Sequence, residues 1–307
     1  MARNRDQYPA KQNASNGEAA AGTSPSAVPE AAFGCPRDFL RNRFVYVLIS
    51  PRAGGLSIGI NMNPDKKCNF DCVYCEVDRS EPARESHLDV AVMAGELKKT
   101  LAIVHQDGLR GHPAYRALPA ELLQLRHVTL SGDGEPTLAP NFVEIVETAV
   151  HIRAVGGFPH FKLVLVTNAT GLDQPLVQQG LRCLTREDEI WAKLDGGTSA
   201  YLQQVNRPDV PIEKILQNIL TLARQRPVVI QSLFLSLNGQ EPPEDEIQQY
   251  ALRLNELKAA GAQIPLVQIY SATRPRFNPV CGHLPLRSLS QIAHTVQKVS
   301  GLKSEVF

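Results

Sequence analysis

The sequence lacks the features that mark several large classes of protein. It contains no apolar run close to the ~18 residues from which a membrane-spanning helix is recognised. Six cysteines in 307 residues are too few for a disulfide-stapled secreted domain, which is shorter and denser in cysteine. The 32 Lys and Arg residues nearly balance the 31 Asp and Glu residues, so the chain is not basic overall, although a local basic patch could still bind nucleic acid. We therefore expect a globular, cytoplasmic protein with no membrane association.

The first 32 residues also lack Leu, Ile, Phe and Trp, and they are rich in Ala, Ser, Asn, Gly and Pro. Such a segment cannot bury enough apolar surface to offset the entropy of ordering it. Its basic start is not followed by the apolar run of a signal peptide, and Asp6, Glu18 and Glu30 argue against a transit peptide. We predict a disordered tail over residues 1–33 and one folded domain over residues 34–307.

Beyond the tail, strand-like and helix-like segments alternate. The apolar run LVLVT at 163–167 is typical of a buried parallel strand. Met93, Leu97 and Leu101 recur at helical spacing after Asp89, a plausible N-cap. About six strand-then-helix units follow one another, which predicts a parallel sheet that right-handed crossovers curl in one direction. The predicted fold is α/β, a partial (β/α)6 TIM-like barrel rather than a closed eight-unit barrel.

The strongest motif is the loop CNFDCVYC, which places Cys68, Cys72 and Cys75 just past a predicted strand. Three thiolates within eight residues can close on one metal centre. Buried structural cysteines prefer apolar surroundings, and this loop is polar. Structural zinc takes four ligands, yet no fourth Cys or His lies close, His87 being the nearest. A ferredoxin-type cluster would likewise show four cysteines in a tighter run.

Three ligands therefore predict a metal centre that keeps an open position. A cubane iron–sulfur cluster held by three thiolates leaves one iron with free coordination sites, and an open metal site indicates chemistry rather than structure. The remaining cysteines, Cys35, Cys183 and Cys281, lie far apart in the sequence. Each is most simply a small core residue, and none stands out as a hydrogen-atom donor.

Polar segments follow the next three predicted strands. These are SGDGEPTL at 131–138, Thr167-Asn168, and Lys193-Leu194-Asp195-Gly196. Taken singly they could be a glycine-rich loop, a helix cap and a solvated ion pair. In parallel α/β folds, however, ligands bind beyond the carboxyl ends of the strands, where all three segments would meet. The pattern predicts a single site at that rim.

The spacing C-x3-C-x-aromatic-C resembles the signature of the radical S-adenosylmethionine (SAM) superfamily. The surrounding runs resemble the branch that contains the wyosine-type tRNA enzymes (4-demethylwyosine synthases) and bacterial relatives. This resemblance covers roughly Leu56 to Arg276 and is carried by GLSIGINMNPDKKCNFDCVYCEVDR, TLSGDGEPTLAPNF, LVTNAT, AKLDGG, VNRP and TRPRF.

The resemblance implies an enzyme whose 4Fe–4S cluster, bound by Cys68, Cys72 and Cys75, reductively cleaves SAM to a 5′-deoxyadenosyl radical. The radical would take hydrogen from a substrate, and an external flavodoxin- or ferredoxin-like protein would supply the electron. The SAM site that it implies places Tyr74 near the adenine, a glycine-containing segment at the methionine end, and three further side chains around the pocket: Gly134, Glu135 and Pro136, then Asn168, Lys193 and Asp195.

The sequence does not identify the substrate. A tRNA base is one reading, and a peptide, a protein or a small molecule is the alternative. The chain departs from its relatives by having Asp133 where they tend to have Asn, and only Cys35 precedes the triad, so a second cluster is not expected. A non-enzymatic iron–sulfur protein and a zinc-binding module are rival classes, but neither explains Gly134-Glu135-Pro136 after the following strand.

Overall fold

The computed structural model describes residues 39–272 and 280–307. The predicted tail over residues 1–33, Cys35 and the TRPRF segment lie outside the described residues. The boundary predicted for a single domain over residues 34–307 stays a prediction.

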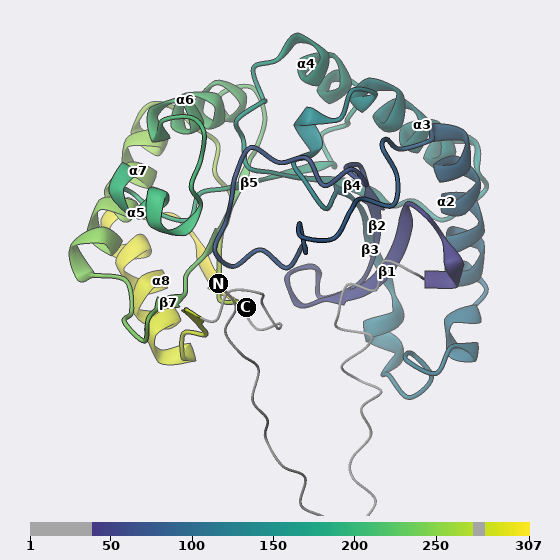
Figure 1. The fold of residues 1–307 in the computed structure, drawn as a ribbon, viewed down its shortest axis with the longest axis horizontal. Helices are drawn as coiled ribbons and strands as arrows, with labels where there is room; N and C mark the ends of the chain where they lie inside the picture. The colour runs from purple at the N-terminus through teal and green to yellow at the C-terminus, as the bar shows by residue number, and fades with distance from the viewer. Residues whose placement is uncertain (1–38, 273–279) are drawn as a thin grey trace, which may run out of the picture.

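One curled eight-stranded sheet forms the centre of the fold, in the order β1-β2-β3-β4-β5-β6-β8-β10. β1 pairs antiparallel with β2, and every later neighbouring pair is parallel. Figure 1 shows the strands following an arc with the helices on its outer side. The strands are β1 (Val45–Ser50), β2 (Gly55–Asn61), β3 (Leu125–Ser131), β4 (Lys162–Thr167), β5 (Glu189–Lys193), β6 (Val229–Leu233), β8 (Val267–Tyr270) and β10 (Ser304–Val306).

Helices connect the parallel strands as expected for β/α units. They are α2 (Val90–His105), α3 (Phe142–Val155), α4 (Pro175–Arg182), α5 (Ser199–Val205), α6 (Ile212–Ala223), α7 (Glu244–Ala259) and α8 (Leu286–Ser300). Short 3-10 turns are η1 (Phe39–Arg41), η2 (Pro51–Ala53), η3 (Gly108–Gly111), η4 (Ala120–Leu123) and η5 (Pro136–Leu138), and β7 (Ser236–Leu237) pairs with β9 (Cys281–Gly282). The units that begin at β2, β3, β4, β5, β6 and β8 confirm the partial (β/α)6 barrel.

The first strand pair differs from the rest because of its short connection. Only η2 and Gly54 separate β1 from β2, which is far too short for the crossover that a parallel pair requires. Gly54 has φ +67° and closes this turn. β1 therefore folds back as a hairpin and extends the arc by one antiparallel strand.

The two faces of the sheet have different surroundings because strand side chains alternate. Ile58, Leu130 and Leu165 are fully buried in the main core, together with helix residues such as Leu97 and Ile145. Asp89 caps α2 by accepting a hydrogen bond from the Val92 amide at 3.0 Å, as predicted.

Of the helices in residues 39–272 and 280–307, none combines the length and apolar character needed to cross a bilayer.

Candidate active site

A cavity of about 1220 Å³ lies within the arc of the sheet. Side chains from β1 to β6 and from β8 line it, among them Thr129, Gln231 and Tyr270. Ligand pockets commonly measure roughly 300–1,000 Å³, so this cavity has room for more than one small ligand. Tyr74 and Cys75 of the predicted site line it directly, as does Asp133.

The cysteine loop follows β2 and is attached to neighbouring segments through its main chain. The amides of Asp71 and Val73 donate to the carbonyls of Asn206 and Val205 at 3.0 and 2.8 Å. On the other side, the Glu135 amide donates to the Lys67 carbonyl at 2.9 Å. The loop is therefore fixed between the β3 loop and the end of α5.

All three thiols of the loop are free, and each sulfur accepts one N–H hydrogen bond. The Phe70 amide donates to Cys68, the Asn206 side-chain amide to Cys72, and the Arg79 guanidinium to Cys75, each at 3.4 Å. Such donors stabilise sulfur once it carries negative charge. The three sulfurs thus have the surroundings of prospective thiolate ligands.

Burial keeps Cys68 and Cys72 protonated in the absence of a metal. It raises the pKa of Cys68 to about 11 and that of Cys72 to about 12. A bound metal would replace these protons, because the thiolate is the form that ligates a metal.

A single metal ion and an iron–sulfur cluster need different arrangements of three thiols. Among the residues that the structure describes, no three or more His, Cys, Asp and Glu side chains form a group that could hold one ion. In a 4Fe–4S cluster each cysteine ligand binds a different iron, so three separate thiols on one loop are compatible with such a cluster.

Asp195 is the centre of a buried hydrogen-bond network beside Cys72. The Tyr74 hydroxyl donates to its Oδ2, and the Asn206 side-chain amide donates to the same oxygen at 2.7 Å. Its Oδ1 accepts from the Leu233 amide at 2.8 Å. Burial and the Asp195 carboxylate raise the pKa of the Tyr74 hydroxyl, which stays protonated and remains a donor.

Lys193 adds a positive charge to this network. Its Nζ lies 3.6 Å from Asp195 Oδ1, 3.2 Å from the Tyr270 hydroxyl and 5.1 Å from the centre of the Tyr74 ring. Burial alone would lower the pKa of Lys193, but Asp195, Tyr270 and Cys72 raise it. The ammonium is therefore charged at neutral pH.

Glu135 is buried between two loops and hydrogen-bonded on both carboxylate oxygens. The side chain is 3% exposed, and its carboxylate accepts four hydrogen bonds from the protein. The donors are the Thr137 amide (3.1 Å) and hydroxyl (2.7 Å), the Thr167 hydroxyl (2.5 Å) and the Asn168 amide (2.7 Å). Burial raises the pKa of Glu135, while these donors oppose the rise. Glu135 thus joins the loops after β3 and β4.

Gly134, Pro136 and Asn168 also lie where loops meet. A Cβ at Gly134 would be 1.8 Å from the Lys67 carbonyl oxygen, so only glycine allows this approach to the cysteine loop. Pro136 begins the turn η5. The Asn168 side-chain amide donates to Asn69 Oδ1 of the cysteine loop at 2.8 Å.

The structure therefore brings the predicted residues together in two groups on either side of the cysteine loop. Cys72, Tyr74, Lys193 and Asp195 form one group, and the other contains Cys68, Gly134, Glu135, Pro136 and Asn168. Except for Tyr74 and Cys75, none of them is among the residues that line the described cavity. Their roles as SAM ligands stay predictions.

Sequence analysis gave no role to two residues that the structure places beside cysteine sulfurs. Asn206 donates to Cys72 and Asp195 and lies 3.0 Å from the Tyr74 hydroxyl, and its own side-chain oxygen is buried without a partner in the described chain. Arg79, an exposed residue, donates to Cys75 at 3.4 Å. The VNRP segment was a signal for Asn206, whereas Arg79 is the last residue of the run that contains the cysteines and has no motif of its own.

Replacing Gly134 with alanine tests the contact between the β3 loop and the cysteine loop. The new Cβ cannot avoid Lys67 without a backbone shift, so we expect iron retention to fall about tenfold and stability to fall by about 1–3 kcal/mol. Iron content after reconstitution and thermal unfolding measure these effects. Gly95→Ala is the control, because nothing lies within 4 Å of a Cβ there. Normal iron content in Gly134→Ala would refute the role given to this contact.

The curled α/β half-barrel carries free thiols and a large cavity at the carboxyl ends of its strands, the place where barrel enzymes bind their ligands. The sequence model of the radical SAM superfamily matches residues 62–250. The chain belongs to the radical SAM superfamily, and it is a radical SAM enzyme. Membership implies SAM, an iron–sulfur cluster, an electron donor and a substrate on which SAM-derived radical chemistry acts.

The chain is also similar in sequence to UPF0026 proteins. A UPF0026 protein of Helicobacter pylori is 24% identical over 263 residues, covering 80% of this chain and 78% of its own. A UPF0026 protein of Synechocystis sp. is 34% identical over 185 residues, covering 59% of this chain and 60% of its own.

Two solved structures share the fold. A radical SAM methyltransferase from Sphaerobacter thermophilus aligns with a TM-score of 0.60 at 11% identity, over 86% of this chain and 68% of its own. TYW1 with a lysine-pyruvate adduct bound aligns with a TM-score of 0.55 at 15% identity, over 85% of each chain. At these identities the similarity concerns the fold alone.

Proposed function

We propose that Cys68, Cys72 and Cys75 bind one 4Fe–4S cluster, and that the chain uses it with SAM to act on a substrate in the inner cavity. The observation that carries the proposal is the arrangement of the loop: three free thiols, each accepting one N–H hydrogen bond, lie on one loop beside a cavity large enough for two ligands.

When bound and reduced by one electron, the cluster and SAM supply a 5′-deoxyadenosyl radical that takes a hydrogen atom from the substrate. The electron donor in this proposal is a separate flavodoxin- or ferredoxin-like protein. A cytoplasmic location is part of the proposal, since free thiols persist in a reducing compartment.

The side chains beside Cys72 have complementary roles in binding SAM. Lys193 offers a charged ammonium to the SAM carboxylate, and the Tyr74 ring offers a flat surface to the adenine. Asp195 orients both, because it accepts from the Tyr74 hydroxyl and lies next to Lys193. The Asn206 oxygen that lacks a protein partner is a further acceptor in this group.

The β3 loop serves the methionine end of SAM in the same proposal. Glu135 cannot offer its carboxylate to an ammonium group without giving up hydrogen bonds to Thr137, Thr167 or Asn168. The main chain around Gly134 and the Asp133 carboxylate, which lines the cavity and accepts from the Asn61 side-chain amide at 2.7 Å, are further acceptors near that end. Glu135 then acts as a positioning residue for that loop.

The substrate that the resemblance to the wyosine enzymes implies is a tRNA base, and a peptide, a protein or a small molecule is the alternative. The net charge of +1 gives nucleic acid no general electrostatic support. The cofactor chemistry is therefore proposed more specifically than the substrate.

Product analysis tests the proposal. Anaerobic reconstitution with iron and sulfide, followed by SAM and dithionite, is expected to yield 5′-deoxyadenosine. A protein that holds its full complement of iron and yet forms none of this product would be a non-enzymatic iron–sulfur protein, and the proposal would fail.

A further inference from the structure

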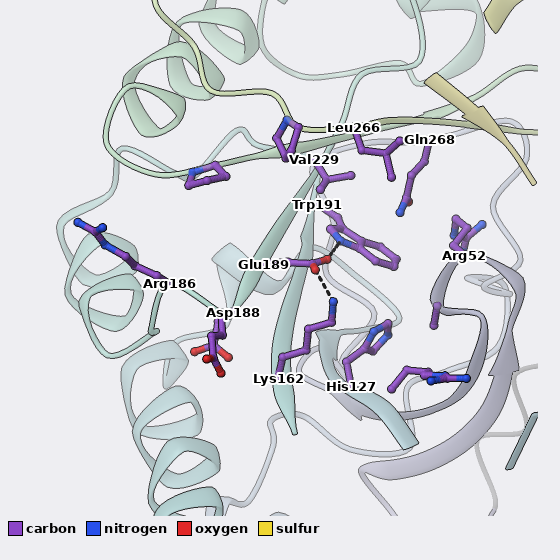
Figure 2. Close-up of a pocket in the computed structure, with 15 residues that line it drawn as sticks. Arg52, His127, Lys162, Arg186, Asp188, Glu189, Trp191, Val229, Leu266 and Gln268 are labelled. Atoms are coloured by element: carbon purple, nitrogen blue, oxygen red, sulfur yellow. Dashed lines mark hydrogen bonds and ion pairs between the residues drawn. The ribbon is translucent and has the colours of Figure 1, made fainter. Parts of the chain in front are cut away.

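A second cavity of about 490 Å³ lies at the opposite end of the barrel, between the amino-terminal ends of the strands. Figure 2 shows the side chains that line it, including residues at the starts of β4, β5 and β6. Arg52, His127 and Trp191 line both this cavity and the large one. These three side chains therefore form the floor between the two cavities.

Arg52 is a cation that has no counter-ion among the residues that the structure describes. Within residues 39–272 and 280–307, no hydrogen bond or ion pair involves its guanidinium, and its Nε is buried without a partner. The guanidinium lies over the Tyr270 ring, 4.2 Å from the ring centre. A partly buried guanidinium that keeps its donors unused has a strong capacity to bind an anion.

The acidic side chains of the lower cavity are occupied elsewhere. Glu189 pairs with Lys162 and accepts from the Trp191 indole at 2.7 Å. Asp188 accepts from both terminal nitrogens of Arg153, at 2.5 and 3.0 Å. None of these carboxylates therefore compensates the positive charge of Arg52 at the floor.

Two further polar side chains with unused hydrogen-bonding groups lie beside Arg52. His127 is 2% exposed and packs edge-on against Trp191 with 5.3 Å between ring centres, and in the described chain neither of its ring nitrogens has a hydrogen-bond partner. Burial, Lys162 and Arg52 lower the pKa of His127 to about 3, so its ring is neutral at pH 7 and carries one N–H.

Gln268 supplies the remaining donor. Its side-chain oxygen accepts from Gln231 at 3.2 Å, which leaves its own amide N–H groups without an acceptor among the described residues. Figure 2 shows this amide nitrogen on the side of Trp191 that faces Arg52. A guanidinium, an imidazole N–H and an amide thus line one cavity, a donor set suited to an oxyanion.

We propose that Arg52 and His127, which line both cavities, bind an oxyanion group of the substrate, a carboxylate or a phosphate, at the floor of the reaction cavity, with the Gln268 amide as a further donor on the lower side of that floor. This inference rests on the proposed function, because it assigns the large cavity to the substrate. It narrows the substrate class to molecules that carry such an anionic group at one end and reach from the floor toward Tyr74 and Cys75.

Trp191 provides a direct readout, since it is the single tryptophan of the chain and part of the floor. The reconstituted full chain would be titrated with inorganic phosphate and, separately, with malonate, at constant ionic strength, while Trp191 fluorescence is followed. We expect a saturable change, and the anion that binds more tightly identifies the group as phosphate or carboxylate.

Charge variants make this test specific. Arg52→Gln is expected to weaken anion binding at least about tenfold, as expected for loss of charge-assisted hydrogen bonds. Arg186→Gln removes the same charge from the exposed rim of the lower cavity and is expected to change binding less than about twofold. Arg52→Lys keeps the positive charge but lacks the paired donors of the planar guanidinium, so its anion affinity is expected to lie between those of the wild type and Arg52→Gln. If Arg52→Gln does not fold, Arg52→Lys takes its place in the comparison with Arg186→Gln.

The proposal is overturned if neither anion gives saturation in the wild type, or if Arg52→Gln and Arg186→Gln weaken binding equally. Both results are independent of 5′-deoxyadenosine formation, which is measured in the wild type without added anion. A failure of the anion site is therefore distinguishable from a failure of the proposed function.

Discussion

Cys72→Ala is expected to lose the cluster and all detectable 5′-deoxyadenosine. Cys72 is the thiol that receives the Asn206 amide at 3.4 Å, so the variant removes a ligand from the middle of the site. Loss of an outer-shell partner already costs roughly 10–100-fold in metal affinity or activity, and loss of a ligand should cost about a hundredfold or more. Iron and sulfide content and product yield after anaerobic reconstitution measure this.

A matched control uses another free cysteine. Cys183 is partly exposed at the end of α4, far from the loop in sequence, and Cys183→Ala should keep wild-type iron and activity. If Cys72→Ala retained iron and product, or if both variants lost them equally, the assignment of the loop as the cluster site would be wrong.

Glu135→Gln is expected to lower the free energy of unfolding by about 2–4 kcal/mol. One carboxylate oxygen accepts from the Thr137 amide and the other from the Asn168 amide. Whichever way the new side-chain amide turns, its NH₂ group faces a backbone N–H that has lost its acceptor. Urea unfolding of the metal-free protein isolates this effect from cofactor binding.

Glu147→Gln, at an exposed position on α3, is the control for the same chemical change and should stay within about 0.5 kcal/mol of the wild type. If Glu135 instead bound the SAM ammonium group, Glu135→Gln would keep its stability and require more SAM for half-maximal product formation. That result would contradict the positioning role.

The architecture was largely predictable because apolar periodicity is a local property. This periodicity is clear in the sequence segments that form β2 to β6 and β8, and in the helices between them. β10 escaped prediction because Ser304–Val306 is only three residues long and is placed by pairing with β8. The antiparallel β1–β2 pair depends on the short 51–54 connection rather than on strand composition.

The candidate site was predictable in position and less so in its contacts. Loops that follow parallel strands must meet at one rim, so the cysteines and the segments around Gly134, Asn168 and Lys193 could be expected to gather there. Asn206 bonds to a cysteine 134 positions away, and this depends on how two loops fold against each other. For the same reason, only the structure shows that both carboxylate oxygens of Glu135 are hydrogen-bonded and that Arg52 has no counter-ion within residues 39–272 and 280–307.

The most direct test of the central claim is the EPR spectrum of the reduced, reconstituted protein with and without SAM. Three cysteines leave one iron of a 4Fe–4S cluster without a protein ligand, so SAM binding at that iron is expected to change the spectrum. A reduced cluster whose spectrum is the same with saturating SAM as without it would contradict the account.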